Sequence, residues 1–364
     1  VRSVDCKTQE VMITPASSPL PKEEKLKYDY LVLALGSAID FFDIPGLAEQ
    51  AHTFGSVLDA IRLRRLIRDG LEKQASEKNR SPLTILVGGG GATGVEFACE
   101  LAALFHHLER QGALKRGAWE MMLVEASRRI LPPLPLRASQ IAHRRLEELG
   151  VKIMLDTCIK RVAKVAEVIL APRPLKPGEK EQALLCSFLP EHEKKVRADI
   201  VIWAGGIRAN ALLTQCGLPT DRKGRVEVDE HLAVKGLERV FALGDNALLV
   251  DSRTNQPVPA LAQAAIAQGQ VVAENVARLL KAKGLSFSAP KDSPLAFYSF
   301  PEFPTVLPIG GKRAIVVWGR MIFDGFFGWI LRQMADLRYF FSILPWTKAA
   351  RLFCKGFKVY TKND

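Results

Sequence analysis

An apolar run that passes through a glycine-rich turn into a second apolar run constrains the fold of this chain most. Leu83–Val87 contains one threonine among apolar residues, the next seven residues read GGGGATG, and Val95–His107 has the apolar spacing of a helix. A buried strand that turns through glycines into a helix begins a βαβ unit with a parallel sheet. The sequence therefore predicts an α/β fold.

The glycine turn has the GxGxxG spacing, at Gly89, Gly91 and Gly94. The first glycine permits the tight turn, the second lets the backbone approach a pyrophosphate, and the third lets the helix pack closely on the strand. The N-terminus of the helix adds N–H groups and the positive end of the helix dipole. The turn predicts a dinucleotide site, and the alternative is a glycine-rich turn that binds nothing.

Glu125 follows the next predicted strand, Met121–Val124, where a dinucleotide fold places the acid that holds the ribose hydroxyls. A carboxylate there repels a 2′-phosphate and favours NADH over NADPH. The nearby Arg128 and Arg129 leave NADPH open. The alternative is an ordinary solvated carboxylate at the end of a strand.

Glu96 lies in the first turn of the predicted helix. The helix dipole alone favours an acid at this position. The functional alternative is that Glu96 relays protons or shapes the pocket for an electron acceptor.

A second cofactor signal comes from two strands that end in glycine. Arg239–Leu243 runs into Gly244-Asp245, and the apolar run from Tyr28 ends at Gly36. Gly244 lets the chain approach a cofactor, and Asp245 can accept a hydrogen bond from a sugar-alcohol hydroxyl. Gly-Asp alone also occurs in simple turns and helix caps, but the pairing with Gly36 favours a cofactor site.

Two glutamines lie near the start of a predicted helix from about Leu261 to Lys283. Gln263 and Gln268 are roughly 140° apart on a helix and cannot share a face. Their neutral amides can hydrogen-bond a carbonyl acceptor. The alternative is a pair of solvated side chains.

The last part of the chain is basic and aromatic. Residues 312–364 hold ten Lys/Arg, three Asp/Glu and 12 of the 28 aromatic residues, against a net charge of +12 for the whole chain. Apolar residues between Phe323 and Leu344 have helical spacing, and Pro345 ends the pattern. In the segment that follows, the basic residues are Lys348, Arg351, Lys355, Lys358 and Lys362, and the aromatic residues opposite them are Trp346, Phe353, Phe357 and Tyr360.

This pattern is typical of amphipathic helices that lie in a lipid interface. Packing of the first helix into the core or a dimer interface stays open as an alternative. No known nucleic-acid-reading module accompanies the basic residues, so we expect no nucleic acid partner.

Several common classes are disfavoured by what the sequence lacks. The six cysteines are scattered without a CxxC pair, which indicates a reducing compartment and argues against zinc, another metal or a disulfide framework. No stretch reaches about 18 uncharged apolar residues, so we expect no transmembrane helix and no proton pumping.

Taken together, four motifs resemble the type II NADH:quinone oxidoreductases, which belong to the flavoproteins with two dinucleotide folds. The motifs are GGGATGVE at Gly89–Glu96, VIWAGG at Val201–Gly206, ALGDNA at Ala242–Ala247 and AQAAIAQ at Ala262–Gln268.

The resemblance implies an FAD-dependent NADH dehydrogenase that passes electrons to a membrane quinone without pumping protons. It implies that the residues where quinone meets the flavin are Glu96, Gln263 and Gln268. The residues implied at the two cofactors, FAD and NADH, are Gly36, Gly89, Gly91, Gly94, Glu125, Gly206, Gly244 and Asp245.

The expected architecture is two Rossmann-like domains, of which the FAD domain is incomplete here, and a C-terminal amphipathic helical anchor. We assign 1–80 to the first part of the FAD domain and the connector, 81–205 to the NADH domain, 206–290 to the second part of the FAD domain and 291–364 to the anchor. Such proteins hold the ADP half of FAD with a first GxGxxG, which this sequence lacks. Because Val1 begins in mid-pattern, we expect a segment upstream of it.

Other functions of the same fold remain as alternatives. They are sulfide:quinone, ferredoxin and disulfide reductases, and a membrane-bound NAD(H) sensor without turnover. We expect a peripheral membrane protein on the cytoplasmic face of the inner or plasma membrane, and a homodimer is left open.

Overall fold

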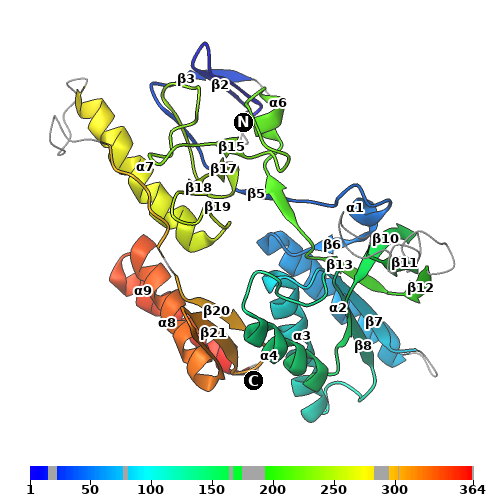
Figure 1. Ribbon diagram of the computed structural model, residues 1–364. Helices are drawn as coiled ribbons and strands as arrows, with labels where there is room; N and C mark the ends of the chain where they lie inside the picture. Colours follow the sequence, from blue (N-terminus) through cyan, green and yellow to red (C-terminus); the bar gives the residue numbers. More distant parts are fainter. Residues whose placement is uncertain are drawn as a thin grey trace. The chain divides into compact units, whose positions relative to one another are not determined.

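The computed structural model describes residues 1–14, 23–76, 81–163, 167–173, 193–282, 295–301 and 303–362, with the backbone alone from 358 onward. The chain forms two compact units (Figure 1). Unit 1 consists of Val1–Asp40 and Ile207–Phe303, and unit 2 consists of Phe41–Gly206 and Pro304–Asp364.

A five-stranded parallel sheet forms the centre of unit 2. Its strand order is β6-β13-β7-β8-β9, and every neighbouring pair is parallel. All residues of β7 and β13 are buried, as expected for central strands of a covered parallel sheet. The strands are β6 (His52–Thr53), β13 (Ile200–Trp203), β7 (Leu83–Gly88), β8 (Trp119–Val124) and β9 (Lys152–Met154).

Helices cover this sheet because each has one apolar face. In α3 (Ala92–Arg110), residues at spacings of three and four turn toward the sheet and are fully or almost fully buried. They are Val95, Ala98, Cys99, Ala102 and Phe105. Burying a side chain such as that of Phe105 stabilises the fold by about 1.5–3 kcal/mol. The other helices of this part are α1 (Leu47–Gln50), α2 (Val57–Ser76) and α4 (Leu136–Glu148).

Two small antiparallel sheets complete unit 2. One consists of β10 (Thr157–Ala163), β11 (Glu167–Pro172) and β12 (Lys194–Arg197). The other consists of β20 (Thr305–Pro308), β21 (Ala314–Trp318) and β22 (Met321–Gly325). This second sheet was not predicted from the sequence.

The second sheet shares a core with the parallel sheet. Leu307, Ile309 and Ile315 belong to the same buried cluster as the apolar face of α3. Arg145 of α4 donates a hydrogen bond from Nε to the Ile309 carbonyl at 3.0 Å. Residues 304–325 are therefore part of the folded core of unit 2.

Two helices follow this sheet, α8 (Phe326–Ile343) and α9 (Trp346–Lys362). They lie side by side, and α8 packs on β20 and β21 (Figure 1). The backbones of α8 and β21 approach closely at Gly328, where an added Cβ would lie 2.3 Å from the Ala314 carbonyl oxygen. The helix predicted to end at Pro345 is confirmed.

Unit 1 is built from short strands and one long helix. Strand β4 (Leu31–Leu33) pairs in parallel with β16 (Val240–Ala242), and α7 (Ala262–Ala282) packs on the turn that follows β16. The sheet β1-β2-β3 is antiparallel, with strands Ser3–Asp5, Glu10–Ile13 and Glu24–Lys27. The remaining elements are β5 (Ser37–Ile39), β14 (Ile207–Ala209), α6 (Leu212–Gln215), β15 (Val226–Glu227), η3 (Gly244–Asn246), β17 (Ala247–Leu248), β18 (Val250–Asp251) and β19 (Gln256–Pro257).

The structure confirms the α/β class and the strand–turn–helix around the glycine turn. It places residues 304–364 in the unit that contains the glycine turn, whereas the sequence analysis treated 291–364 as a region of its own. As a division into functional domains, the assignment from sequence stays a prediction. None of the described helices has the length and apolar character needed to cross a bilayer.

Candidate functional site

The glycine turn after β7 is shaped by two close backbone approaches. Gly89 has φ +108°, and a Cβ there would lie 2.6 Å from Cα of Gly205. A Cβ at Gly94 would lie 1.9 Å from the Gly89 carbonyl oxygen. A Cβ at Gly91 would meet nothing within 4 Å. Gly89 and Gly94 are thus needed for the turn itself, while Gly91 leaves space open at its surface.

The N-terminus of α3 is open to an anion. Gly91 is the N-cap of this helix and, among the described residues, no side chain caps it. The N–H groups of the first turn and the positive end of the helix dipole therefore face the open space at Gly91. This arrangement fits the pyrophosphate of a dinucleotide.

Glu125 is held beside this turn, directly after β8. Its Oε2 accepts a hydrogen bond from the Gly90 N–H at 2.6 Å, and its Oε1 accepts one from the Ser127 N–H at 2.7 Å. These bonds fix the carboxylate at the end of β8, beside the glycine turn. Arg129 donates to three carbonyls of its own loop, those of Leu131, Pro132 and Leu134.

The segment after β13 forms the neighbouring wall of the turn. Ala204 donates a backbone hydrogen bond to the Gly88 carbonyl at 2.8 Å. A Cβ at Gly205 would lie 2.3 Å from the Trp203 ring. Gly206 follows as the last residue of this part of unit 2. The motif VIWAGG thus brings bare backbone against the glycine turn.

Glu96 lies one turn into α3 and borders a cavity of about 550 Å³ between α3 and α8. Burial raises the pKa of its carboxyl, while Arg332 opposes and Asp336 reinforces that shift. No pattern in the sequence connected α8 with Glu96. The cavity is lined by Phe54, Thr93, Glu96, Phe97, Glu100, Leu101, Ala103, Leu104, Pro308, Gly311, Trp329, Arg332, Gln333 and Asp336.

In unit 1, the Gly244–Asp245 turn is tied to α7 by one of the predicted glutamines. Gly244 has φ +63° and donates its N–H to Oε1 of Gln268 at 2.7 Å. Gln268 is buried, whereas Gln263 is exposed, so the two side chains face different surroundings, as their spacing predicted. Gln268 holds the Gly244–Asp245 turn in place and Gln263 is accessible.

Asn246 joins the two glycine-ended strands, and the sequence analysis gave it no role. It is fully buried. With its amide oxygen facing Leu35 and Gly36, it accepts their N–H groups at 2.9 and 3.0 Å and donates to the Gly36 carbonyl at 3.1 Å. The only sequence signal was its position directly after Gly-Asp.

Asp245 borders a second cavity, of about 330 Å³, that lies within unit 1. Three cationic side chains, those of Arg208, Lys223 and Arg225, also line it. Arg225 is paired with Asp221, donating from Nε at 3.0 Å and from Nη2 at 2.7 Å. An acceptor carboxylate beside cations suits a ligand that carries hydroxyl and phosphate groups.

Glu96 belongs to unit 2, and Gln263 and Gln268 belong to unit 1. The structure brings Gly36, Gly244 and Gln268 together in unit 1. In unit 2 it brings together Gly89, Gly91, Gly94 and Glu125.

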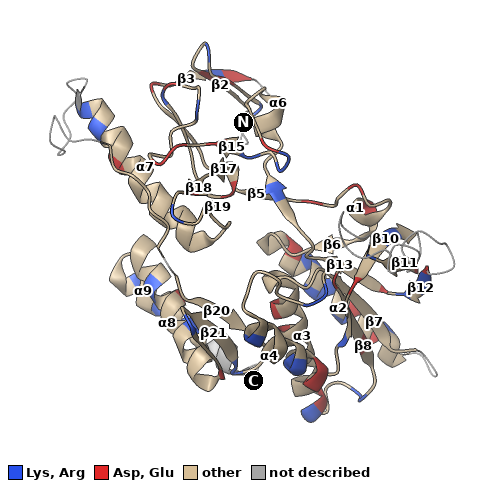
Figure 2. Cartoon of the chain, viewed as in Figure 1, with Lys and Arg blue, Asp and Glu red and all other residues tan. Residues whose placement is uncertain are grey.

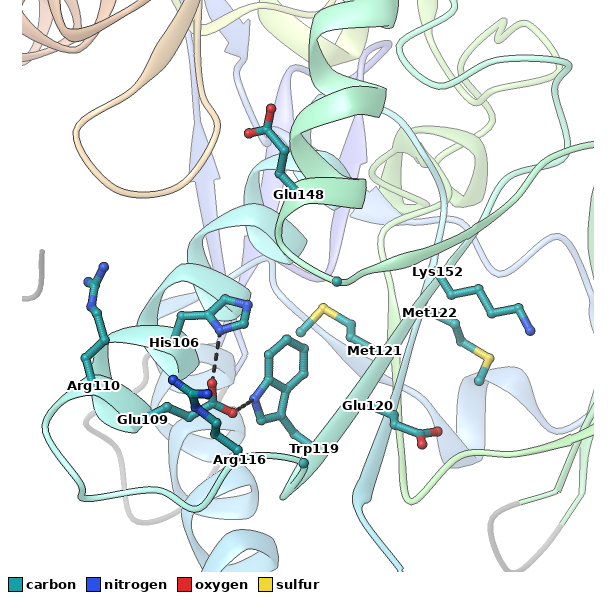
Figure 3. A pocket seen from close by; sticks show the side chains of 12 residues that line it. His106, Glu109, Arg110, Arg116, Trp119, Glu120, Met121, Met122, Glu148 and Lys152 are labelled. Atoms are coloured by element: carbon teal, nitrogen blue, oxygen red, sulfur yellow. Dashed lines mark hydrogen bonds and ion pairs between the residues drawn. The ribbon is translucent and has the colours of Figure 1, made fainter.

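A cavity of about 780 Å³ lies along the first four residues of β8 (Figure 3). Glu109 accepts hydrogen bonds there from Trp119 Nε1 at 3.0 Å and contacts His106 Nδ1 at 3.0 Å. Neither Glu125 nor a residue of the glycine turn lines this cavity, so it is separate from the candidate dinucleotide site.

Comparison with known proteins relates this geometry to one family. Residues 1–269 match the family described as pyridine nucleotide-disulphide oxidoreductase. The type II NADH:quinone oxidoreductases of Staphylococcus aureus and Staphylococcus saprophyticus are 30% and 28% identical to the chain over 319 residues, which cover 87% of this chain and 72% of each relative.

The fold is similar to that of NDH2 from Plasmodium falciparum in complex with NADH. That match has a TM-score of 0.79 at 16% identity and covers 97% of this chain and 80% of that one. The chain therefore belongs to the pyridine nucleotide-disulphide oxidoreductase family and, within it, to the type II NADH:quinone oxidoreductases.

Proposed function

We propose that this protein oxidises NADH and passes the electrons through FAD to a quinone. The observation that carries this proposal is the hydrogen bond between Gly244 and Gln268, because it joins the AQAAIAQ helix to the Gly-Asp turn that fits a flavin cofactor. The staphylococcal relatives, which are 28% and 30% identical to the chain, are named type II NADH:quinone oxidoreductases.

NADH is the substrate that the glycine turn of unit 2 fits. The open N-terminus of α3 at Gly91 accommodates the pyrophosphate, and Glu125 accepts hydrogen bonds from ribose hydroxyls. The carboxylate is already fixed by two backbone N–H groups, so it is positioned before the substrate arrives. It also disfavours the 2′-phosphate of NADPH, and the guanidinium of Arg129 is engaged by its own loop.

FAD fits unit 1 at Gly36, Gly244 and Asp245. The two glycines bring bare backbone to the ends of β4 and β16, and Asp245 supplies an acceptor for the hydroxyls of the ribityl chain. When bound there, FAD would supply the two-electron redox chemistry that links oxidation of NADH to reduction of the quinone. The protein contributes binding, orientation and charge.

Glu96 and Gln263 serve the quinone half of the reaction. Reduction of a quinone consumes protons, and Glu96 retains a proton at its carboxyl more readily than an exposed glutamate does, because its pKa is raised by burial. The exposed amide of Gln263 can donate a hydrogen bond to a quinone carbonyl without competing for protons.

A membrane surface is the partner that α8 and α9 fit. Phe327 and Trp346 are 76% and 74% exposed. The basic residues Lys348, Arg351 and Lys355 of α9 are exposed as well, and Figure 2 shows the positive charge of this helix. Aromatic and cationic side chains together favour an anionic lipid interface. The side chains of Lys358, Tyr360 and Lys362 lie outside the described residues.

The activity is tested by mixing the FAD-loaded protein with NADH under anaerobic conditions. We expect the flavin absorbance to bleach and to return on addition of a quinone. Gln263→Ala should slow the return without slowing the bleaching. The matched control is Gln270→Ala, because Gln270 is also exposed but lies two turns further along α7. Reoxidation of the flavin by a ferredoxin or a disulfide but not by quinone, or bleaching by sulfide but not by NADH, would reject the proposal.

The membrane contact is tested by sedimentation with anionic vesicles. A variant that combines Lys348→Glu, Arg351→Glu and Lys355→Glu with Trp346→Ser should no longer sediment with the vesicles. Undiminished sedimentation of this variant would reject the lipid contact. A deletion of 312–364 is unsuitable, because it removes the buried strand β21.

A further inference from the structure

The cavity between α3 and α8 places charges of α8 opposite Glu96. Arg332, Gln333 and Asp336 enter it from α8, and Glu96 enters it from α3. The position of α8 is fixed by its close packing at Gly328 against β21. The relation between the two helices is therefore set within the core of unit 2.

The carboxyl of Glu96 makes no hydrogen bond or ion pair within the described part of the chain, and the charged neighbours that shift its pKa, Arg332 and Asp336, lie on α8. Burial raises the pKa of its carboxyl, Arg332 lowers it and Asp336 raises it. Among the described residues that line the cavity, the remaining ionisable side chain belongs to α3. Glu100 also lines the cavity, and the thiol of Cys99 is uncharged because burial raises its pKa to about 12. The walls contributed by Phe54, Pro308 and Gly311 carry no charge.

Arg332 and Asp336 form an ion pair one helical turn apart. Each side chain is about one-third exposed, at 32% and 30%. The pairing compensates the charge of Arg332 and so weakens its attraction for the carboxylate of Glu96. Removal of either partner therefore changes the field at Glu96, and the two removals act in opposite directions.

We propose that the Arg332–Asp336 pair of α8 sets the charge of Glu96, so that α8 governs proton delivery to the quinone as well as contacting lipid. Arg332 and Asp336 are positioning residues in this scheme, since they act through Glu96. The role in quinone reduction rests on the proposed function. The effect of the Arg332–Asp336 pair on the charge of Glu96 is independent of the proposed function.

The test uses Asp336→Asn and Arg332→Gln in the FAD-loaded full chain. Loss of the Asp336 charge leaves Arg332 uncompensated and lowers the pKa of Glu96, whereas loss of the Arg332 charge raises it. Protonated Glu96 is the active form, so quinone reduction falls as pH rises through this pKa. We expect the midpoint of the fall to move down by about half to one pH unit in Asp336→Asn and up by a similar amount in Arg332→Gln.

Two controls separate this effect from general damage. Arg338→Gln removes a cation from an exposed position of α8 that does not line the cavity, and it should leave the midpoint unchanged. In a Glu96→Gln background neither variant should shift the profile. Bleaching of the flavin by NADH should stay at the parent rate in Asp336→Asn, Arg332→Gln and Arg338→Gln. Thermal unfolding of each variant verifies that it is folded.

A second readout does not depend on turnover. The infrared band of the protonated carboxyl that disappears in Glu96→Gln can be titrated in the resting protein, and its midpoint should move as the activity does. Equal midpoints in the parent, Asp336→Asn and Arg332→Gln, or shifts that persist without Glu96, would overturn the proposal. If quinone reduction is absent but the infrared midpoints shift in opposite directions, the proposed function fails and the effect of the pair on Glu96 stands.

Discussion

Alanine substitutions at two glycines of the same turn should separate folding from NADH binding. At Gly91, φ is −72° and an added Cβ meets nothing within 4 Å. Alanine is a poorer N-cap than glycine by about 0.5 kcal/mol. Alanine also makes the unfolded chain less flexible, which stabilises the folded state by about 0.4–1 kcal/mol. The free energy of unfolding should therefore change by no more than about 0.5 kcal/mol.

The affinity for NADH should fall in the same variant, although its stability hardly changes. The methyl group of Gly91→Ala occupies the space through which the pyrophosphate approaches the backbone of α3. We expect the Kd for NADH to rise at least about tenfold, which corresponds to about 1.4 kcal/mol. The folded protein should thus lose affinity without losing stability.

Gly94→Ala should first lose stability. Its Cβ would lie 1.9 Å from the Gly89 carbonyl oxygen, a backbone atom that cannot rotate away. Overpacking of this kind costs about 1–3 kcal/mol, and a unit of this size loses about 2–4 °C in Tm for each kcal/mol.

Thermal unfolding without ligand and calorimetric titration with NADH measure the two effects on the same samples. An unchanged Kd for Gly91→Ala would refute the assignment of the turn to the pyrophosphate. A stable Gly94→Ala would refute the steric argument.

Three further substitutions or reactions test other parts of the structure. Glu125→Ala should raise the KM for NADH by roughly tenfold in steady-state assays, because it removes the ribose acceptor and frees the Gly90 and Ser127 N–H groups; an unchanged KM would reject that role. Gly328→Ala should lower the free energy of unfolding by about 1–3 kcal/mol in denaturant titrations, whereas Gly356→Ala, whose Cβ meets nothing within 4 Å, should not destabilise the protein. Thiol reagents should modify the exposed Cys354 and spare Cys99 from pH 6 to 9, because the thiol of Cys99 keeps its proton below a pKa of about 12; mass spectrometry of the labelled peptides would detect early modification of Cys99.

The sequence was sufficient for features whose cause is local. The β7–α3 segment could be predicted because an apolar run, glycines at fixed spacing and a helical pattern follow one another within about 25 residues. The same holds for α7, whose alanine-rich start also showed that Gln263 and Gln268 face different ways. Each of these signals lies within the element that it describes.

The sheet of residues 305–325 could not be predicted in this way. Its strands are four or five residues long, and the connections contain Gly310, Gly311 and Gly319. Such short segments lack a distinct period. Their stability comes from burial against the core that α3 shares, which is a contact between distant parts of the chain.

The environment of Glu96 was missed for the same reason. The apolar spacing of α8 predicted a helix, but nothing in that spacing indicates that Arg332 and Asp336 lie opposite an acid of α3. Likewise, Gly-Asp and the glutamines were recognised separately, whereas the bond from Gly244 to Gln268 required both to be placed in space.

The shared core of unit 2 has a consequence for how the protein can mature during translation. Leu307, Ile309 and Ile315 complete an interior whose other walls emerge from the ribosome some two hundred residues earlier. Unit 2 therefore cannot complete its core until residues 304–325 have been synthesised. Until then, a patch of α3 and α4 remains exposed. A premature stop codon before this point would leave a polypeptide that carries an intact GxGxxG motif and yet is a target for chaperones and proteases.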